Sequence, residues 1–212
     1  MVQSKDVRRS DLRLSHAIAS RRQDWPNLMT KGAVFFDRDG VLITTEVVDG
    51  APIAENNPEK INFMPGAIEL CQRLHKAEVQ TFLITNQPDI ARGKVGYESV
   101  STINRIVKET CNLTEIAVCP HDDVDNCNCR KPQPGMILSL ASRFGIDLQK
   151  SIVVGDRWRD IEAGHSAGCR TIFIDYKYGE KQAPNPTHIV SSVEQVGLLL
   201  ETYFDLDRIE EV

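Results

Sequence analysis

The sequence predicts an α/β fold, a Rossmann-like three-layer α/β/α sandwich built around a mostly parallel sheet. Short apolar segments rich in Val, Ile and Phe alternate along the chain with longer segments whose apolar residues recur at helical spacing. The short segments are apolar at consecutive positions, which is typical of strands covered by helices on both faces. Strands that alternate with helices in this way pair in parallel.

The elements follow one another in a regular order. Short apolar runs between polar or turn-forming residues predict strands at 33–37, 79–85, 113–119, 151–156, 170–175 and 188–190. Apolar stripes at helical spacing predict helices at 65–77, 97–109, 134–145, 160–168 and 193–204. Pro65 suits the beginning of the first helix, and Gly145 suits the end of the third. The segment 43–62 is expected to be a loop or a tight flap because it contains Gly50 and Pro52.

The chain is predicted to consist of a polar N-terminal extension, residues 1–30, and one domain, residues 31–212. Residues 1–31 carry seven Lys or Arg and three Asp or Glu, net +4, which leaves a net charge of −9 on the other 181 residues. An acidic body disfavours nucleic-acid binding. No apolar run approaches the roughly 20 residues of a membrane helix, and the N-terminus is too polar for a secretory signal. We expect a cytoplasmic protein, a monomer, that acts on a small molecule.

Acidic residues follow the first predicted strand in the sequence FFDRDG. Asp37 and Asp39 are two residues apart, so in extended backbone their side chains share one face. Gly40 then permits a sharp turn. Two carboxylates on one face repel each other unless their roles differ, for example a nucleophile or metal ligand beside a proton donor. A solvated acidic loop is the simpler alternative.

Polar residues also follow other strands, and ligands of parallel sheets bind at the carboxyl ends of the strands. Thr85 offers a hydroxyl there, although a threonine after a strand is commonly only a turn residue. Arg130 and Lys131 end a cysteine-rich loop. Asp156 ends the fourth predicted strand. Asp160 lies four residues further on, where it could share the site or cap the next helix.

The cysteine-rich loop has the spacing C-x-H-x₅-C-x-C, which suits tetrahedral Zn²⁺. Its four potential ligands are Cys119, His121, Cys127 and Cys129. The intervening DDVDN has too little apolar content to order itself, which favours a metal over free thiols. The lack of a secretory signal disfavours disulfides. Four protein ligands leave no open position for water, so the zinc would be structural and would fix the entry of Arg130 and Lys131 into the site.

Four motifs occur in the order DxDG, TN after an apolar strand, K-P and GDxxxD, within residues 33–164. This arrangement resembles the haloacid dehalogenase-like phosphohydrolase superfamily, and the resemblance implies a phosphatase. Only 48 residues separate Asp37 from Thr85, and 46 separate Thr85 from Lys131. The predicted elements fill both intervals, so we expect no separate cap domain. The site should be open, with the segment 43–62 and the zinc loop 119–129 forming its rim.

The resemblance also implies roles for the motif residues. Asp37 would attack phosphorus and become an aspartyl phosphate, and Asp39 would protonate the leaving alkoxide and then deprotonate water. Mg²⁺ would be held by Asp37, Asp156 and the backbone carbonyl of Asp39. Thr85 and Lys131 would hold the phosphoryl oxygens.

The zinc loop narrows the resemblance. The sequences TNQPDIARGK and CPH…CNCRKPQPGM are similar to the D-glycero-D-manno-heptose 1,7-bisphosphate phosphatase family and to its relative, the histidinol-phosphate phosphatase family. By this resemblance the substrate would be contacted by Asn86, Arg130 and Arg157. Departures from the heptose pattern in DRDGVLIT and TNQPDIARG fall in segments that would touch the sugar, so the substrate stays open.

Two other functions are weighed against a metabolite phosphatase. The first is a 3′-phosphatase acting on nucleic-acid ends, which the acidic body disfavours. The second is a zinc-stabilised binding module without catalysis, which the complete set of motif residues disfavours.

Overall fold

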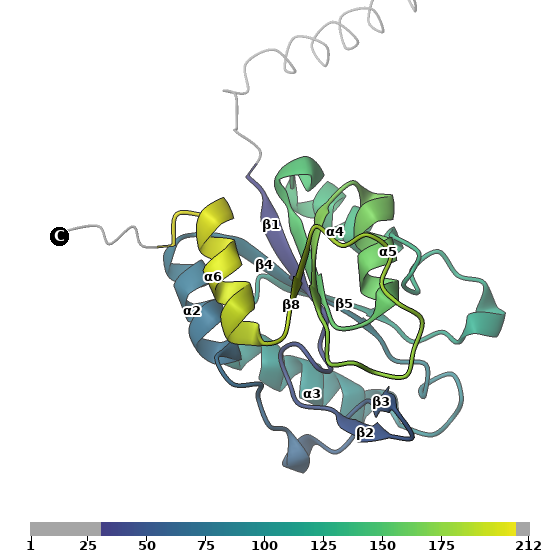
Figure 1. The fold of residues 1–212 in the computed structure, drawn as a ribbon. Coiled ribbons are helices and arrows are strands. Elements are labelled where there is room, and N and C mark those ends of the chain that lie inside the picture. The colour runs from purple at the N-terminus through teal and green to yellow at the C-terminus, as the bar shows by residue number, and fades with distance from the viewer. Residues whose placement is uncertain (1–30, 207–212) are drawn as a thin grey trace, which may run out of the picture. The chain divides into compact units, whose positions relative to one another are not determined.

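Six parallel strands form the central sheet of the computed structural model, which describes residues 31–206 (Figure 1). The predicted extension, residues 1–30, lies outside the described residues. The strands are β1 (Ala33–Phe36), β4 (Gln80–Asn86), β5 (Glu115–Cys119), β6 (Ile152–Gly155), β7 (Arg170–Ile174) and β8 (His188–Val190). They lie in the order β5-β4-β1-β6-β7-β8, and every pair is parallel. The predicted parallel sheet is confirmed.

Helices cover both faces of this sheet. One face carries α2 (Ala67–Lys76), α3 (Tyr97–Thr110) and α6 (Val193–Tyr203), and the other carries α4 (Gly135–Phe144) and α5 (Trp158–Ala167). In Figure 1, α2 and α6 lie to the left of the strands, and α4 and α5 lie to the right. None of these helices combines the length and the apolarity needed to cross a bilayer, as far as the described residues show.

Strand β1 is apolar throughout because it contributes to both cores. Val34 and Phe36 pack in the core beneath α2, α3 and α6, whereas Ala33 and Phe35 pack in the core beneath α4 and α5. This division follows from the alternation of side chains along a strand. The ring of Phe35 stacks on that of Phe82 of β4, with centroids 5.2 Å apart.

The segment between β1 and α2 forms a small flap, as expected for residues 43–62. It contains an antiparallel hairpin, β2 (Glu46–Val48) and β3 (Ala51–Ile53), and the 3-10 helix η1 (Pro58–Lys60). The Thr45 hydroxyl donates to the Ile53 carbonyl at 2.5 Å and closes the base of the hairpin. No separate cap domain lies between β1 and β4 in this described part of the chain.

Candidate active site

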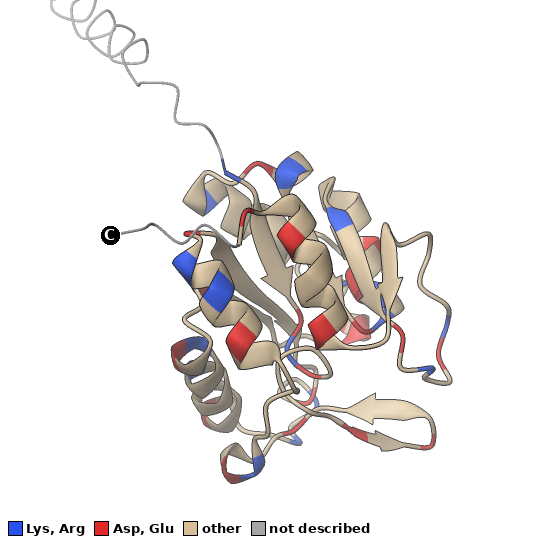
Figure 2. Cartoon of the chain, turned by 60° about the vertical axis from the view of Figure 1, so that its left-hand side comes forward, with Lys and Arg blue, Asp and Glu red and all other residues tan. Residues whose placement is uncertain are grey.

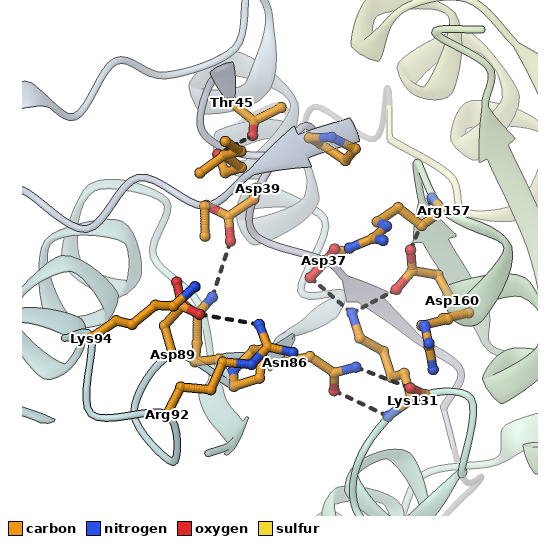
Figure 3. A pocket seen from close by; sticks show the side chains of 16 residues that line it. Asp37, Asp39, Thr45, Asn86, Asp89, Arg92, Lys94, Lys131, Arg157 and Asp160 are labelled. Atoms are coloured by element: carbon orange, nitrogen blue, oxygen red, sulfur yellow. Dashed lines mark hydrogen bonds and ion pairs between the residues drawn. The ribbon is translucent and has the colours of Figure 1, made fainter. Parts of the chain in front are cut away.

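A pocket of about 280 Å³ opens at the carboxyl ends of the central strands (Figure 3). From β1 the strand order runs to β4 and β5 on one side and to β6, β7 and β8 on the other, so the connections between strands switch direction at β1. Such switch points are where parallel α/β sheets bind their ligands. The pocket is lined mainly by charged and amide side chains together with the flap: Asp37, Asp39, Thr45, Pro52, Ile53, Ala54, Asn86, Gln87, Pro88, Asp89, Arg92, Lys94, Lys131, Arg157, Arg159 and Asp160.

Lys131 is the buried cation of the pocket. Its Nζ lies 2.8 Å from Asp37 Oδ1 and 2.5 Å from Asp160 Oδ1, and it donates to the Ile84 carbonyl at 2.8 Å. Asn86 holds the Lys131 backbone, accepting from its N–H and donating to its carbonyl, both at 3.0 Å. Burial lowers the pKa of Lys131, but Asp160 and Asp37 outweigh burial and raise it above its ordinary value. The side chain therefore stays charged.

Three buried carboxylates gather around this lysine. Oxygen atoms of Asp37, Asp156 and Asp160 lie within 4.8 Å of one another. Burial and the charges of Asp37 and Asp160 raise the pKa of Asp156 well above its usual value. Asp156 Oδ1 is buried and has no hydrogen-bond partner among the described residues. One ammonium does not balance three carboxylates, so an oxygen-ligand divalent cation such as Mg²⁺ fits this set.

Asp160 serves both the helix and the pocket. Its Oδ2 accepts from the Arg157 N–H at 3.1 Å and caps the beginning of α5, while its Oδ1 faces Lys131. Burial raises the pKa of Asp160 to about 6, although Lys131 acts in the opposite direction. The sequence left open whether Asp160 shares the site or caps the next helix, and the structure shows that it does both.

Asp39 lies apart from the carboxylate cluster, on the other side of Asp37. Arg38 donates to both of its oxygens at 3.1 Å, and Gln87 Nε2 donates to Oδ2 at 3.0 Å. Burial, helped by the charge of Asp37, raises the pKa of Asp39, while Arg38 and Gln87 lower it. A carboxyl with a raised pKa holds its proton more readily, which suits a general acid.

The four residues of the cysteine-rich loop converge on one point. Their Sγ and Nδ1 atoms lie 3.3–3.6 Å apart in the five pairs that are in contact. A tetrahedral zinc with Zn–S bonds near 2.3 Å would place its sulfur ligands about 3.8 Å apart, so the cluster needs little adjustment to hold one. Cys127 and Cys129 also pack against the core beneath α4 and α5. The cluster is thus anchored on the sheet.

Comparison with known proteins places this geometry in a family. Residues 128–196 match the HAD-hydrolase-like family model. The D-glycero-beta-D-manno-heptose-1,7-bisphosphate 7-phosphatase of Rhodopseudomonas palustris is 33% identical over 148 residues, which cover 64% of this chain and 79% of the relative. The enzyme of the same name from Bordetella bronchiseptica is 32% identical over 153 residues, covering 70% of this chain and 83% of the relative.

The chain belongs to the haloacid dehalogenase-like phosphatases. The crystal structure of the D,D-heptose 1,7-bisphosphate phosphatase from B. bronchiseptica, complexed with magnesium and phosphate, superimposes with a TM-score of 0.70 at 28% identity. The match covers 81% of this chain and 98% of that one. The predicted fold and superfamily are therefore confirmed, and this protein is a phosphoric monoester hydrolase.

Two residues predicted to act in this phosphatase do not line the pocket. Thr85 is buried and does not line the pocket, and its hydroxyl accepts from Gln87 at 2.8 Å. A phosphoryl contact of Thr85 stays a prediction. Arg130 does not line the pocket either, because its guanidinium donates to Asp123 at 2.7 Å and to the His121 carbonyl at 3.2 Å. Asn86 and Arg157, the other two predicted substrate contacts, both line the pocket.

The cysteine-rich loop was expected to form part of the rim; none of residues 119–129 lines the pocket itself, and the rim role stays a prediction. The loop acts through two acidic side chains. Asp122 accepts two hydrogen bonds of 2.7 Å from Arg92, and Asp123 lies 3.4 Å from Arg159. Both arginines line the pocket, so the loop sets their positions.

The sequence analysis did not single out Arg38, which lies between Asp37 and Asp39. Its side chain is 0% exposed and donates to Asn104 Oδ1 at 3.0 Å and to the Glu55 carbonyl at 3.2 Å. Asn104 is buried on α3, beside the apolar residues Ile103 and Val107 of that helix. The sequence carries a signal for this arrangement, because Arg38 closely follows a fully apolar strand. A charged residue that is buried at such a position needs hydrogen-bond or ionic partners.

Proposed function

We propose that the chain is a magnesium-dependent phosphatase that hydrolyses a phosphate monoester of a small sugar, of the heptose bisphosphate kind, through an aspartyl phosphate. The observation that carries the proposal is the convergence of Asp37, Asp39 and Lys131 on one polar pocket beside the buried carboxylate of Asp156. The magnesium and phosphate in the related B. bronchiseptica crystal structure support the same reading.

Each residue has a definite task in this proposal. An oxygen of Asp37 attacks phosphorus as the bond to the sugar oxygen breaks, and the Asp39 proton passes to the leaving alkoxide. Asp39 then takes a proton from the water that attacks the aspartyl phosphate. Lys131 keeps Asp37 oriented and adds positive charge beside the transferring group. Mg²⁺, when held by Asp37, Asp156 and the Asp39 carbonyl, would neutralise charge on the phosphoryl oxygens.

The rim of the pocket supports a small, highly charged substrate. Four basic residues line it: Arg92, Lys94, Arg157 and Arg159. Four flap residues close one side: Thr45, Pro52, Ile53 and Ala54. A long nucleic-acid strand is not favoured, because acidic and basic segments are interspersed on the side shown in Figure 2 and the net charge of residues 32–212 is −9. We also propose a tetrahedral zinc at the cysteine-rich loop, which keeps Lys131 in position in the pocket. The protein is proposed to be a monomer and to be located in the cytoplasm.

Replacing Asp37 by Asn tests the reaction. The amide cannot attack phosphorus, so turnover should fall by on the order of 10⁴-fold or more while the far-UV circular dichroism stays unchanged. Omitting Mg²⁺ should remove the activity of the unmodified enzyme, and adding it back should restore it. The panel should contain heptose 1,7-bisphosphate, other sugar phosphates and histidinol phosphate. Near-normal turnover by Asp37→Asn, or activity without any divalent ion, would contradict the proposal.

A further inference from the structure

The segment from Asp175 to Glu180, which we call the strap, joins β7 to the edge of the pocket although no motif marks it. It begins where the Asp175 N–H donates to the Val190 carbonyl of β8 at 2.8 Å. Three successive residues of the strap, Tyr178, Gly179 and Glu180, each contact a residue outside it. Each of these contacts reaches a different part of the site.

The first contact concerns a buried carboxylate. The Tyr178 hydroxyl donates to Asp156 Oδ2 at 3.0 Å. The other oxygen, Oδ1, is buried and has no hydrogen-bond partner among the described residues. Gly40 approaches the same oxygen closely: it has φ +80°, and a Cβ there would lie 2.0 Å from Oδ2. One oxygen thus accepts from Tyr178 and has no free space beside Gly40, and the other is left available.

The other contacts keep the strap in place. The Gly179 N–H donates to the Gly50 carbonyl at the tip of the flap hairpin at 2.9 Å, and Glu180 accepts from Arg157 Nε at 3.0 Å. The Tyr178 ring packs on the Tyr176 ring, with centroids 5.8 Å apart. The hydroxyl of Tyr178 therefore approaches Asp156 from a support that is tied to both the flap and the pocket wall.

We propose that Tyr178 is a positioning residue for the magnesium site, which orients Asp156 so that Oδ1 is presented to the ion. The inference rests on the proposed function, because it assumes that Asp156 is a magnesium ligand. Hydrogen bonds to the distal atom of a metal ligand fix its orientation, and losing one typically weakens metal affinity about 10–100-fold.

The chain offers a matched control in Tyr176. Its hydroxyl is buried and has no hydrogen-bond partner among the described residues, so Tyr176→Phe removes the same atom from the adjacent ring without breaking a bond. Tyr178→Phe removes the bond to Asp156 and keeps the ring that packs on Tyr176. Because each variant loses one hydroxyl and keeps its ring, and only the Tyr178 hydroxyl touches a carboxylate, the difference between the two variants isolates the hydrogen bond.

The test is isothermal titration of Mg²⁺ into zinc-loaded, magnesium-free protein, with urea unfolding of each variant alongside. We expect Tyr178→Phe to bind Mg²⁺ about 10–100-fold more weakly than the unmodified protein and Tyr176→Phe to bind within about twofold. Equal affinity of Tyr178→Phe and the unmodified protein overturns the inference alone. Failure of the unmodified protein to bind Mg²⁺ overturns the proposed function, and the inference with it.

A crystal structure of the unmodified protein with Mg²⁺ tests the same point without relying on the folding of a variant. We expect Asp156 Oδ1 on the ion and the Tyr178 hydroxyl still on Oδ2. Coordination through Oδ2, with Tyr178 displaced, would overturn the positioning role.

Discussion

Replacing Lys131 by Met removes one buried charge and keeps a side chain of similar length. The Lys131 side chain is 3% exposed and pairs with Asp37 at 2.8 Å and with Asp160 at 2.5 Å. Removing one partner of a buried ion pair costs about 3–5 kcal/mol because the remaining charge stays uncompensated. Here two carboxylates lose their counter-ion at once. We therefore expect the free energy of unfolding at pH 8 to fall by about 3 kcal/mol or more in the absence of magnesium.

The loss should depend on pH in a defined direction. Burial already raises the pKa of Asp160 to about 6, and Lys131 opposes that rise. Without Lys131 the folded-state pKa of Asp160 rises further, well above the value near 3.9 of an unfolded chain. A carboxyl with a raised folded-state pKa takes up a proton on folding, so its penalty is full above that pKa and shrinks as the pH falls through it. The destabilisation should be smaller at pH 5 than at pH 8.

Urea unfolding followed by far-UV circular dichroism at both pH values measures this effect. Lys94→Met is the matched control, because Lys94 lines the same pocket, is exposed, and makes no ion pair or side-chain hydrogen bond within residues 31–206. Its free energy of unfolding should stay within about 0.5 kcal/mol of the unmodified protein. A Lys131→Met protein within about 1 kcal/mol of the unmodified one at pH 8, or a penalty that grows toward pH 5, would refute the reasoning.

Two further predictions separate the roles within the site. Asp39→Asn removes the proton donor, so turnover of sugar phosphates, whose alkoxides leave poorly, should fall by about 10²–10⁴-fold. Turnover of an aryl phosphate with a good leaving group should fall far less, and steady-state kinetics on the two substrate classes measures the difference. An equal fall for both classes would contradict the assignment. Cys129→Ser removes one ligand of the cysteine cluster, so metal analysis should find well under one zinc per chain. The value of kcat/KM should fall because Lys131 is held less firmly, while Mg²⁺ affinity and far-UV circular dichroism stay near normal. Full activity in a zinc-free variant would show that the loop does not position the lysine.

The sequence by itself determined the fold class and most element positions. The short, fully apolar runs at β1 and β6 are typical of strands covered on both faces, and the apolar stripes of α2 and α4 are typical of helices that face a core. The carboxylates that follow β1 and β6 were found for the same reason, since parallel strands bring their carboxyl ends to one edge. These features depend on the spacing of apolar residues along short segments, which can be determined from the sequence alone.

Tertiary structure alone decided which side chains meet within the site. Arg130 follows the cysteine cluster as directly as Lys131 does, yet it turns to Asp123 whereas Lys131 turns to Asp37. Tyr178 reaches Asp156 from a segment 22 residues away that carries no motif. The direction of a side chain in a loop depends on charges and packing supplied by distant segments. Spacing along the chain does not encode those contacts, so they appear only when the sheet brings the segments together.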